Sequence, residues 1–424
     1  MTTSPARGEP MTWDFFQQVT LSAEEQETVI QDAANDLASG MTFRQMVDVD
    51  TLNQRALGAV GEVLARRRLD VPRDVMLSLA EKVVGRVNGL GALLPLLRRD
   101  DLSEITITPE GRVFVLKKGA VQFSPVEMSL DQQACGRMVE ALLRPTGRGI
   151  SEATPTVSAK LPRIESLPGL KGGARVHVLH PAVVPSRAGM YSVNIRLFEP
   201  APVKPEKLVE WQVAPENVIA DLLSAVARGV RMLVIGGTAS GKTTFLSAMC
   251  SAIPKDARVV KIEDPEEIWM DHPHVVTIEA RKAPLGSTSV QDYTLRHGVD
   301  DAMRMSPKWL IVGEVRTGDA AASLFRAQMS DHPGLSTFHA EGPEAMVARM
   351  ALIMGVDAKI ERMNAKDLIA QGIEVLVQVG VPRSGDKRRL IGVWEIQPEL
   401  KGGNVAFEQL YAFGDKSMKP ITRR

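Results

Sequence analysis

The stretch RMLVIGGTASGKTTFLSAM, residues 231–249, decides the fold of this chain. An apolar run ends in a glycine-rich turn, and a lysine and two threonines then open a helical pattern. The turn fits G-x-x-x-x-G-K-[ST] from Gly236 through Thr243, with a strand expected before it and a helix after it. Such a string arises by accident in on the order of one chain in a hundred of this length. The sequence therefore predicts a phosphate-binding loop.

The residues of this loop suit the phosphates of a nucleotide. Glycines let backbone N–H groups converge on phosphate oxygens, and the following helix presents the positive end of its dipole. We expect Lys242 to reach the β and γ phosphates and the Thr243 hydroxyl to ligate Mg²⁺. The predicted ATP-binding residues of the loop are Gly236, Gly237, Thr238, Ala239, Ser240, Gly241, Lys242, Thr243 and Thr244.

The composition excludes several classes of protein. The 424 residues predict two or three domains, and 51 basic side chains balance 51 acidic ones, so no overall field draws the chain to nucleic acid or to an acidic membrane. Two cysteines are too few for a disulfide framework or a zinc site and suit a reducing cytosol. No apolar run approaches the length of a membrane span, and the first residues carry no secretory h-region, so we expect no transmembrane segment.

The first 200 residues predict a helical region followed by an α+β domain. Residues 1 to about 15 predict a loosely held arm, and a capping box, Ser22 with Glu25, opens a helix that runs to about Gly40. Apolar and polar residues alternate on both sides of a Pro-Glu-Gly turn at 109–111, which indicates a hairpin. The other expected elements are helices at 47–68, 73–87 and 131–143 and strands at 174–179 and 191–198.

The rest of the chain predicts a mostly parallel sheet. After a helix at 214–228 and the strand of the loop, apolar strand patterns alternate with helical ones, which is typical of a parallel sheet covered on both faces. Ligands bind at the carboxyl ends of such strands. The later segments predict an antiparallel meander, and we expect the last ten residues to be loose. The expected strands are 258–262, 275–278, 309–312, 335–338, 373–379, 388–396 and 405–413, with a Ser-Gly-Asp turn at 384–386.

Domain boundaries follow from these patterns. We expect an arm and helical region at 1–88, an α+β domain at 89–200 and a nucleotide-binding domain at 209–424. The segment APVKPEKL, rich in chain breakers, predicts a linker at 201–208.

Polar residues follow three of the predicted strands directly. The sequence EDPEE, 263–267, follows the first, Gly-Glu-Val-Arg, 313–316, follows the second, and His339 follows the third. Hydrolysis of a nucleotide needs a residue that positions water, a metal and a group that reads the γ-phosphate. Glu314 is the predicted water-positioning residue and His339 the predicted γ-phosphate reader. An isolated histidine or a solvated acidic loop would be the ordinary structural alternative.

The metal ligands follow from the same strand ends. The aspartate usual at the end of the second strand is absent, because this strand ends in Gly-Glu. Metal contact is therefore expected from Thr243, with Glu314 and the 263–267 cluster acting partly through water.

The motifs GGTASGKTT, IEDPEE, MRMSPKWLIVGEVR and LSTFHAEGPEAMVARM, in this order, resemble the four boxes of the secretion or traffic ATPases. These are the motors of type II and type IV secretion, type IV pili and tight-adherence pili. The resemblance extends to residues 93–119 and 172–198 upstream and 375–396 downstream, and it covers roughly residues 90 to 413. The C-terminal strands are most similar to those of the tight-adherence and type IV secretion branches.

The resemblance implies a RecA-like ATPase core at 209–424 and a PAS-like α+β domain at 89–200. It implies a cytoplasmic homohexamer that docks on an inner-membrane platform or channel protein and binds ATP between the two domains. By position it implies that Arg175 and Arg196 reach the nucleotide phosphates, that Glu267 is the functional aspartate-box carboxylate and that Arg316 braces the loop of Glu314. The family's motors localise to the bacterial cytoplasm, at the inner membrane through partners.

The sequence departs from the family's pattern at three places. Ala239 replaces the usual glycine, which is tolerable if its φ is negative. Ser330 to Pro333 replace a common Thr-Gly-His, and Glu341 with Gly342 stand where Asn and Ser are frequent. These departures concern the rate of hydrolysis and its coupling to partners.

The resulting hypothesis is a hexameric motor ATPase that powers pilus assembly or secretion. One alternative is a nucleotide-gated ring subunit with little turnover, which the departures favour. Another is a DNA translocase, which shares the core. The neutral charge balance and the lack of an aromatic and basic path for single strands oppose direct sequence-specific nucleic-acid binding. The helices at 16–88 are the candidate partner-binding region.

Overall fold

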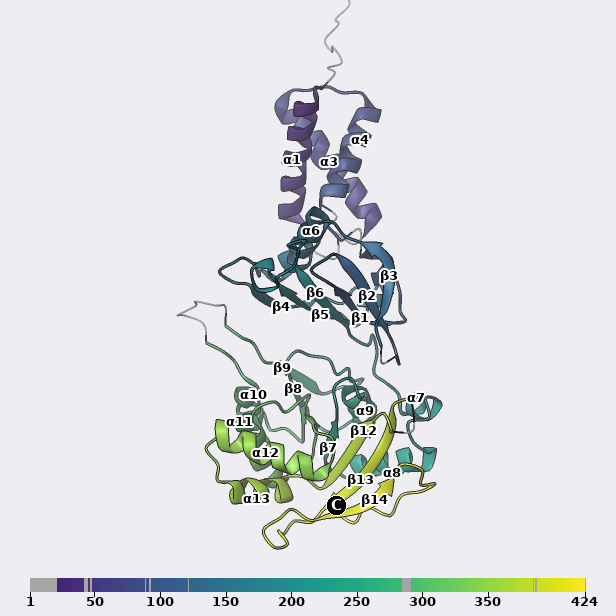
Figure 1. Cartoon of the computed structure of the whole chain (residues 1–424), viewed down its shortest axis with the longest axis vertical. Coiled ribbons are helices and arrows are strands. Elements are labelled where there is room, and N and C mark those ends of the chain that lie inside the picture. The colour runs from purple at the N-terminus through teal and green to yellow at the C-terminus, as the bar shows by residue number, and fades with distance from the viewer. Residues whose placement is uncertain are drawn as a thin grey trace, which may run out of the picture. The chain divides into compact units, whose positions relative to one another are not determined.

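The computed structural model describes residues 21–41, 45, 48–87, 89–90, 93–120, 122–283, 291–383, 385 and 387–423. Two compact units form within it (Figure 1). One holds the described residues up to Val115 together with Ser124–Leu197, and the other holds Leu116–Phe123 and the chain from Phe198 onward. The arm expected at residues 1 to about 15, and two of the three residues of the turn expected at 384–386, lie outside the described residues.

Three long helices lie side by side in the first unit (Figure 1). The predicted capping box is present, because the Ser22 hydroxyl accepts from the N–H of Glu25 while the Glu25 carboxylate accepts from the N–H of Ser22 at 2.8 Å. Each helix buries an apolar stripe against the other two. The three helices are α1 (Ala23–Gly40), α3 (Val49–Arg67) and α4 (Arg73–Val87), which confirms the predicted helices.

The first unit also contains a six-stranded sheet in the order β3-β2-β1-β6-β5-β4. Alternate residues of its central strands enter the core with α6, and the residues between them face solvent. The predicted hairpin, helix and two strands are confirmed, whereas β3 and β4 were not predicted. Both are edge strands, where polar residues and proline weaken the apolar signal. The elements are α5 (Leu94–Leu97), β1 (Leu102–Ile107), β2 (Arg112–Lys117), β3 (Ser124–Ser129), α6 (Gln132–Leu143), β4 (Thr156–Leu161), β5 (Ala174–Leu179) and β6 (Ser192–Leu197).

The second unit is built on an eight-stranded sheet in the order β14-β13-β12-β7-β11-β10-β8-β9. Neighbouring strands from β12 to β9 run parallel, and β13 and β14 add to this sheet antiparallel. The mostly parallel sheet and the C-terminal meander are therefore confirmed. The strands are β7 (Arg231–Gly236), β8 (Val259–Glu263), β9 (Val275–Glu279), β10 (Trp309–Val312), β11 (Gly334–His339), β12 (Val375–Gly380), β13 (Arg389–Ile396) and β14 (Phe407–Ala412).

Helices cover both faces of this sheet, as a strand with two buried faces requires. Met232 and Val234 of β7 enter a core with α8 and α9, whereas Leu233 and Ile235 enter a second core with α10 to α13. The central strand, which carries the phosphate loop, is thus held from both sides. The helices are α7 (Pro205–Glu210), α8 (Glu216–Ala227), α9 (Lys242–Met249), α10 (Leu295–Ala302), α11 (Gly318–Met329), α12 (Pro343–Asp357) and α13 (Arg362–Gly372).

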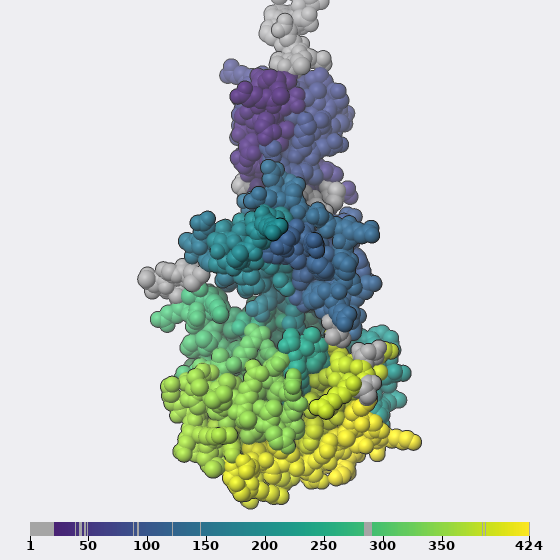
Figure 2. All heavy atoms as spheres, viewed as in Figure 1, coloured from purple at the N-terminus to yellow at the C-terminus, as the bar shows by residue number. Residues whose placement is uncertain are grey.

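The stretch 201–208, for which breakers predict a linker, includes the start of α7, because Pro205 stands in the first turn of this helix, where its missing N–H costs no hydrogen bond. One local expectation needs correction. The described part of the last ten residues, up to Arg423, is not loose: Thr422 and Arg423 donate to the buried carboxylate of Glu395, and Met418 is buried. Figure 2 shows the C-terminal strands and the residues after them, in yellow, in one continuous surface with the second unit.

Candidate active site

The predicted phosphate loop connects β7 to α9 at the carboxyl edge of the sheet, as expected. Gly236 ends the strand where no side chain fits, because a Cβ there would lie 2.2 Å from the carbonyl oxygen of Val379 and 2.5 Å from the hydroxyl of Ser240. Gly241 enters the helix with φ 93°, a conformation that glycine adopts without strain. These two glycines are required by close approach and by backbone conformation.

Ala239 does not have the negative φ that would make it an easy replacement for glycine. Its φ is 57°, in the left-handed region, and the expectation is corrected. A residue with a Cβ is disfavoured there by about 1–2 kcal/mol, because the Cβ approaches the following carbonyl oxygen. The backbone of the loop is therefore strained at Ala239, and contacts with surrounding residues must hold it in this conformation.

The loop residues fit the phosphates of a nucleotide. The Lys242 ammonium donates to the carbonyls of Gly236 at 3.1 Å and Gly237 at 2.8 Å, so it lies along the loop. The first turn of α9 has no side-chain cap, and the buried Ser240 hydroxyl has no hydrogen-bond partner among the described residues. Space is open above Gly237, where a Cβ would meet nothing within 4 Å. The uncapped N–H groups of the first turn of α9 and the Ser240 hydroxyl can thus donate to an anion, and there is space for the anion beside Gly237.

The neighbouring strand ends bring the predicted catalytic residues to the same edge. His339, the last residue of β11, is paired with Gly236 of β7, and its carbonyl accepts from Arg349 at 3.1 Å. Glu314 follows β10, the next strand along the sheet. Its turn is anchored to β11 because the Thr337 hydroxyl donates to the carbonyl of Gly313 at 2.7 Å. Glu314, His339 and the loop therefore come together.

Arg316 links two of these strand ends, as the bracing role predicted for it requires. Its Nε donates to the Glu314 carboxylate at 2.7 Å, and its Nη1 donates to the carbonyl of Asp264 at 3.2 Å. The turn after β8 is thereby tied to the turn after β10. The side chain of Glu314 remains about one-third exposed, which leaves it accessible to a water molecule.

Glu263 plays a structural part that the sequence did not reveal. Its buried carboxylate pairs with Lys261 at 2.8 Å and accepts from the N–H groups of Glu267 and Ile268, each at 3.0 Å. Burial raises the pKa of Glu263, although Lys261 opposes this effect. Glu263 is thus not a solvent-facing member of the 263–267 cluster; it shapes the turn that positions half-buried Glu267. A lysine inside the apolar strand VVKIE was the signal for this pair.

The other two departures from the expected pattern lie at opposite edges of the sheet: Ser330 to Pro333 at the amino edge, and Glu341 at the carboxyl edge, just after β11. Ser330 to Pro333 connect the C-terminus of α11 to the start of β11, at the amino edge of the sheet, and Leu310 donates to the carbonyl of Pro333 there. This stretch therefore cannot contact a nucleotide held at the carboxyl edge. Glu341 is exposed, and its carbonyl accepts from Gln378 at 3.0 Å.

Arg175 and Arg196 belong to the first unit. They face each other across β5 and β6, on the solvent-facing side of the sheet. Lys160 of β4 is paired with Arg175, so the three cations form one row.

One residue near the loop was not predicted. Arg388, directly before β13, donates from Nε to the carbonyl of Ala239 at 2.7 Å and from Nη2 to the carbonyl of Ala120 at 3.2 Å. Ala120 lies in the Leu116–Phe123 connection, which clusters with the second unit. Burial lowers the pKa of this guanidinium. No local pattern pointed to Arg388, because these partners are remote in the chain.

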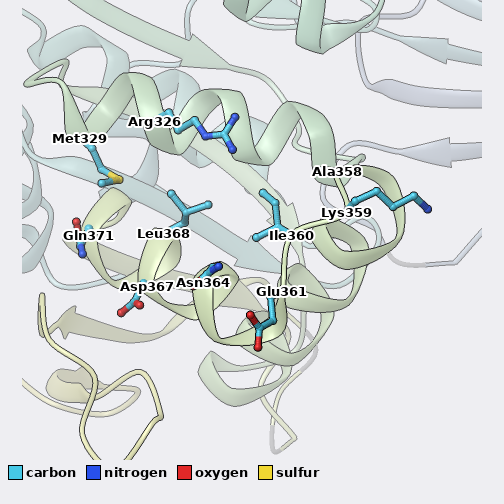
Figure 3. Close-up of a pocket in the computed structure, with 10 residues that line it drawn as sticks. All are labelled: Arg326, Met329, Ala358, Lys359, Ile360, Glu361, Asn364, Asp367, Leu368 and Gln371. Atoms are coloured by element: carbon cyan, nitrogen blue, oxygen red, sulfur yellow. The ribbon is translucent and has the colours of Figure 1, made fainter.

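A hollow of about 580 Å³ lies away from this edge (Figure 3). Arg326 and Met329 line it from the C-terminal end of α11, and Asn364, Asp367 and Leu368 line it from α13. The C-terminal end of α11 leads to the amino edge of the sheet, so this hollow is not part of the nucleotide site.

These features define the class of the protein: a P-loop nucleotide-binding protein with a mostly parallel sheet and its polar residues gathered at the carboxyl edge. The model of the Type II/IV secretion system protein family matches residues 90–383, and the chain belongs to this family. A putative conjugal transfer protein of Mycobacterium tuberculosis is 30% identical over 303 residues, 71% of this chain and 83% of the relative. The type IV secretion system protein PtlH of Bordetella pertussis is 27% identical over 341 residues, 72% and 93% of the two chains.

Two solved structures share the fold. The ATPase DotB of Legionella pneumophila has a TM-score of 0.50 and 19% identity, over 77% of this chain and 83% of that one. The pilus retraction motor PilT with bound ADP also has a TM-score of 0.50, with 16% identity over 73% and 83% of the two chains. The predicted RecA-like core and the resemblance to secretion ATPases are therefore confirmed.

In the part of the chain that the structure describes, no helix is both long and apolar enough to cross a membrane. Within the same ranges, no three or more His, Cys, Asp or Glu side chains gather as a metal site.

Proposed function

We propose that this protein binds ATP at its phosphate loop and hydrolyses it to power pilus assembly or secretion through an inner-membrane complex. The observation that carries the proposal is the common sheet edge at which the loop, Glu314 and His339 lie next to one another. Relatives named for conjugal transfer and type IV secretion support the machine class.

Each residue has a chemical part in this proposal. The loop N–H groups from Gly237 to Thr244 and the Lys242 ammonium bind the phosphates, and Glu314 orients the attacking water. His339 reads the γ-phosphate, Glu267 supplies a carboxylate from the neighbouring turn, and Arg316 holds Glu314 in place. Arg175 and Arg196 contribute charge from the first unit, a role suggested by the family.

Magnesium would be held by the Thr243 hydroxyl, with Glu314 partly through water, and would neutralise charge on the phosphates. The protein acts in this proposal as a cytoplasmic homohexamer at the inner membrane, docked on a platform or channel protein. Direct sequence-specific binding of nucleic acid is not part of the proposal.

The test is phosphate release from magnesium-ATP together with nucleotide binding by the full chain. Lys242→Ala should lose binding, because the loop loses its cation. Glu314→Gln should keep binding but lower turnover on the order of 10² to 10⁴-fold, the range that a positioned base contributes. Glu344→Gln, an exposed carboxylate on α12, is the matched control and should change neither. Turnover by Glu314→Gln at the parental rate would remove Glu314 from its role.

A second candidate is a nucleotide-gated ring subunit with little turnover. The departures from the family's pattern at Ala239 and Glu341 favour it, since both follow strands that end at the candidate site. Verified oligomers that bind ATP but release no magnesium-dependent phosphate would select this candidate over the motor.

A further inference from the structure

Arg388 is positioned on the phosphate loop from a distant part of the chain. β13 begins beside it, and Arg389 is paired with Gly380 of β12 at the carboxyl edge. The Nε of Arg388 lies 2.7 Å from the Ala239 carbonyl oxygen, and the Cδ of Arg388 lies 3.4 Å from the position that a Cβ on Gly241 would take. The side chain therefore covers the strained turn of the loop.

The Ala239 carbonyl belongs to the same peptide plane as the N–H of Ser240. The two groups point in opposite directions because the plane is rigid and trans. A donor that holds the carbonyl outward therefore also fixes where the Ser240 N–H points. Glycine at position 239 would adopt the left-handed turn freely, but alanine does so only when its surroundings impose it. Arg388 provides such a constraint.

We propose that Arg388 is a positioning residue of the nucleotide site: it holds the left-handed turn at Ala239 and so keeps the loop in the shape that receives phosphates. The inference rests on the proposed function and names a residue that the proposed function did not use. Arginine suits the task better than lysine, since its planar fork donates to the Ala239 and Ala120 carbonyls at once.

This positioning role predicts a specific rescue. Arg388→Ala should weaken the binding of a fluorescent ADP analogue with magnesium about tenfold. Without Arg388, Ala239 leaves the left-handed conformation that disfavours its Cβ, and this conformational preference corresponds to about a tenfold change in an equilibrium constant. Ala239→Gly in the same chain should restore binding to within about twofold of Ala239→Gly alone, since glycine needs no support. Arg388→Lys keeps the charge but not the fork and should still bind several-fold more weakly.

The experiment measures dissociation constants for the full chain and these variants, with thermal melts of the nucleotide-free proteins. Arg389→Ala is the matched control: its guanidinium donates to the carbonyls of Trp211 and Arg388, and it should bind ADP like the parent. Absence of binding by the parent overturns the proposed function itself. Parental binding by Arg388→Ala, or weak binding that Ala239→Gly does not restore, overturns the positioning role while leaving the proposed function intact.

Discussion

At the scale of single residues, the pair Lys261–Glu263 shows how a buried charge shapes the site. Both side chains are almost fully buried, and the carboxylate accepts the N–H groups of the turn that carries Glu267. Gly313 is required beside it, because a Cβ there would lie 2.9 Å from the Glu263 side chain. Lys261 has a second partner in Glu266, at 3.1 Å and partly exposed. The Glu263 carboxylate is more deeply buried than that of Glu266, so we expect it to contribute more to the free energy of unfolding.

Glu263→Ala should destabilise the second unit by about 3 kcal/mol, since it leaves a buried ammonium with one remaining carboxylate and frees two backbone N–H groups. Glu266→Ala is the control and should cost under about 1 kcal/mol, because that carboxylate is partly solvated. Urea unfolding followed by tryptophan fluorescence measures both, through Trp269 and Trp309 of this unit. Equal effects of the two substitutions would contradict the structural role of Glu263.

At the scale of elements, β13 joins the end of the chain to the sheet. Buried Glu395 accepts from the N–H and hydroxyl of Thr422 at 2.8 and 2.6 Å and from the N–H of Arg423 at 2.6 Å. The Arg423 guanidinium donates to the carbonyl of Ile396 at 2.6 Å. The segment after β14 is therefore part of the packed unit.

Glu395→Ala should release this segment, because its three donors lose one acceptor group together. We expect a loss of about 2 kcal/mol in unfolding free energy and faster removal of the C-terminal residues by carboxypeptidase. Glu408→Ala removes an exposed carboxylate of β14 that lies 3.9 Å from Lys419; it is the control and should change neither. An unchanged digestion rate for Glu395→Ala would show that the segment is held by other contacts.

At the scale of the whole molecule, the chemistry and the N-terminal helices belong to different units. The phosphate loop and the strand ends around it are packed within the second unit, while α1, α3 and α4 share their core with the first. The helices are therefore available for another task, and we propose partner binding.

Removal of residues 1–88 should leave the dissociation constant for magnesium-ADP within about twofold of the full chain, because the phosphate loop belongs to the second unit. The same deletion should abolish recruitment to source-cell membranes if the helices bind the partner. Circular dichroism of the shortened chain checks that both sheets remain folded. Recruitment that persists would assign the partner surface to another region.

Local patterns of the sequence determined the phosphate loop, the type of the surrounding elements and the place of the candidate site. The glycine and lysine spacing of the loop, the apolar strands around it and the capping box at Ser22 each depend on residues close together in the chain. The order of polar residues after successive strands also predicted the candidate site, because parallel strands bring their carboxyl ends to one edge. These features needed no knowledge of distant contacts.

The tertiary structure decided what distant contacts control. The left-handed turn at Ala239 is held by Arg388, which lies 149 residues further along the chain. Burial of Glu263 depends on Gly313, and the order of the last residues depends on Glu395. Ser330 to Pro333 lie at the amino edge of the sheet, opposite the candidate site, because α11 runs back across the sheet before β11 begins. Tertiary packing sets the φ angle of Ala239, the burial of Glu263 and the position of the chain end beside Glu395. Packing brings together residues that are far apart in the sequence, and no local pattern connects them.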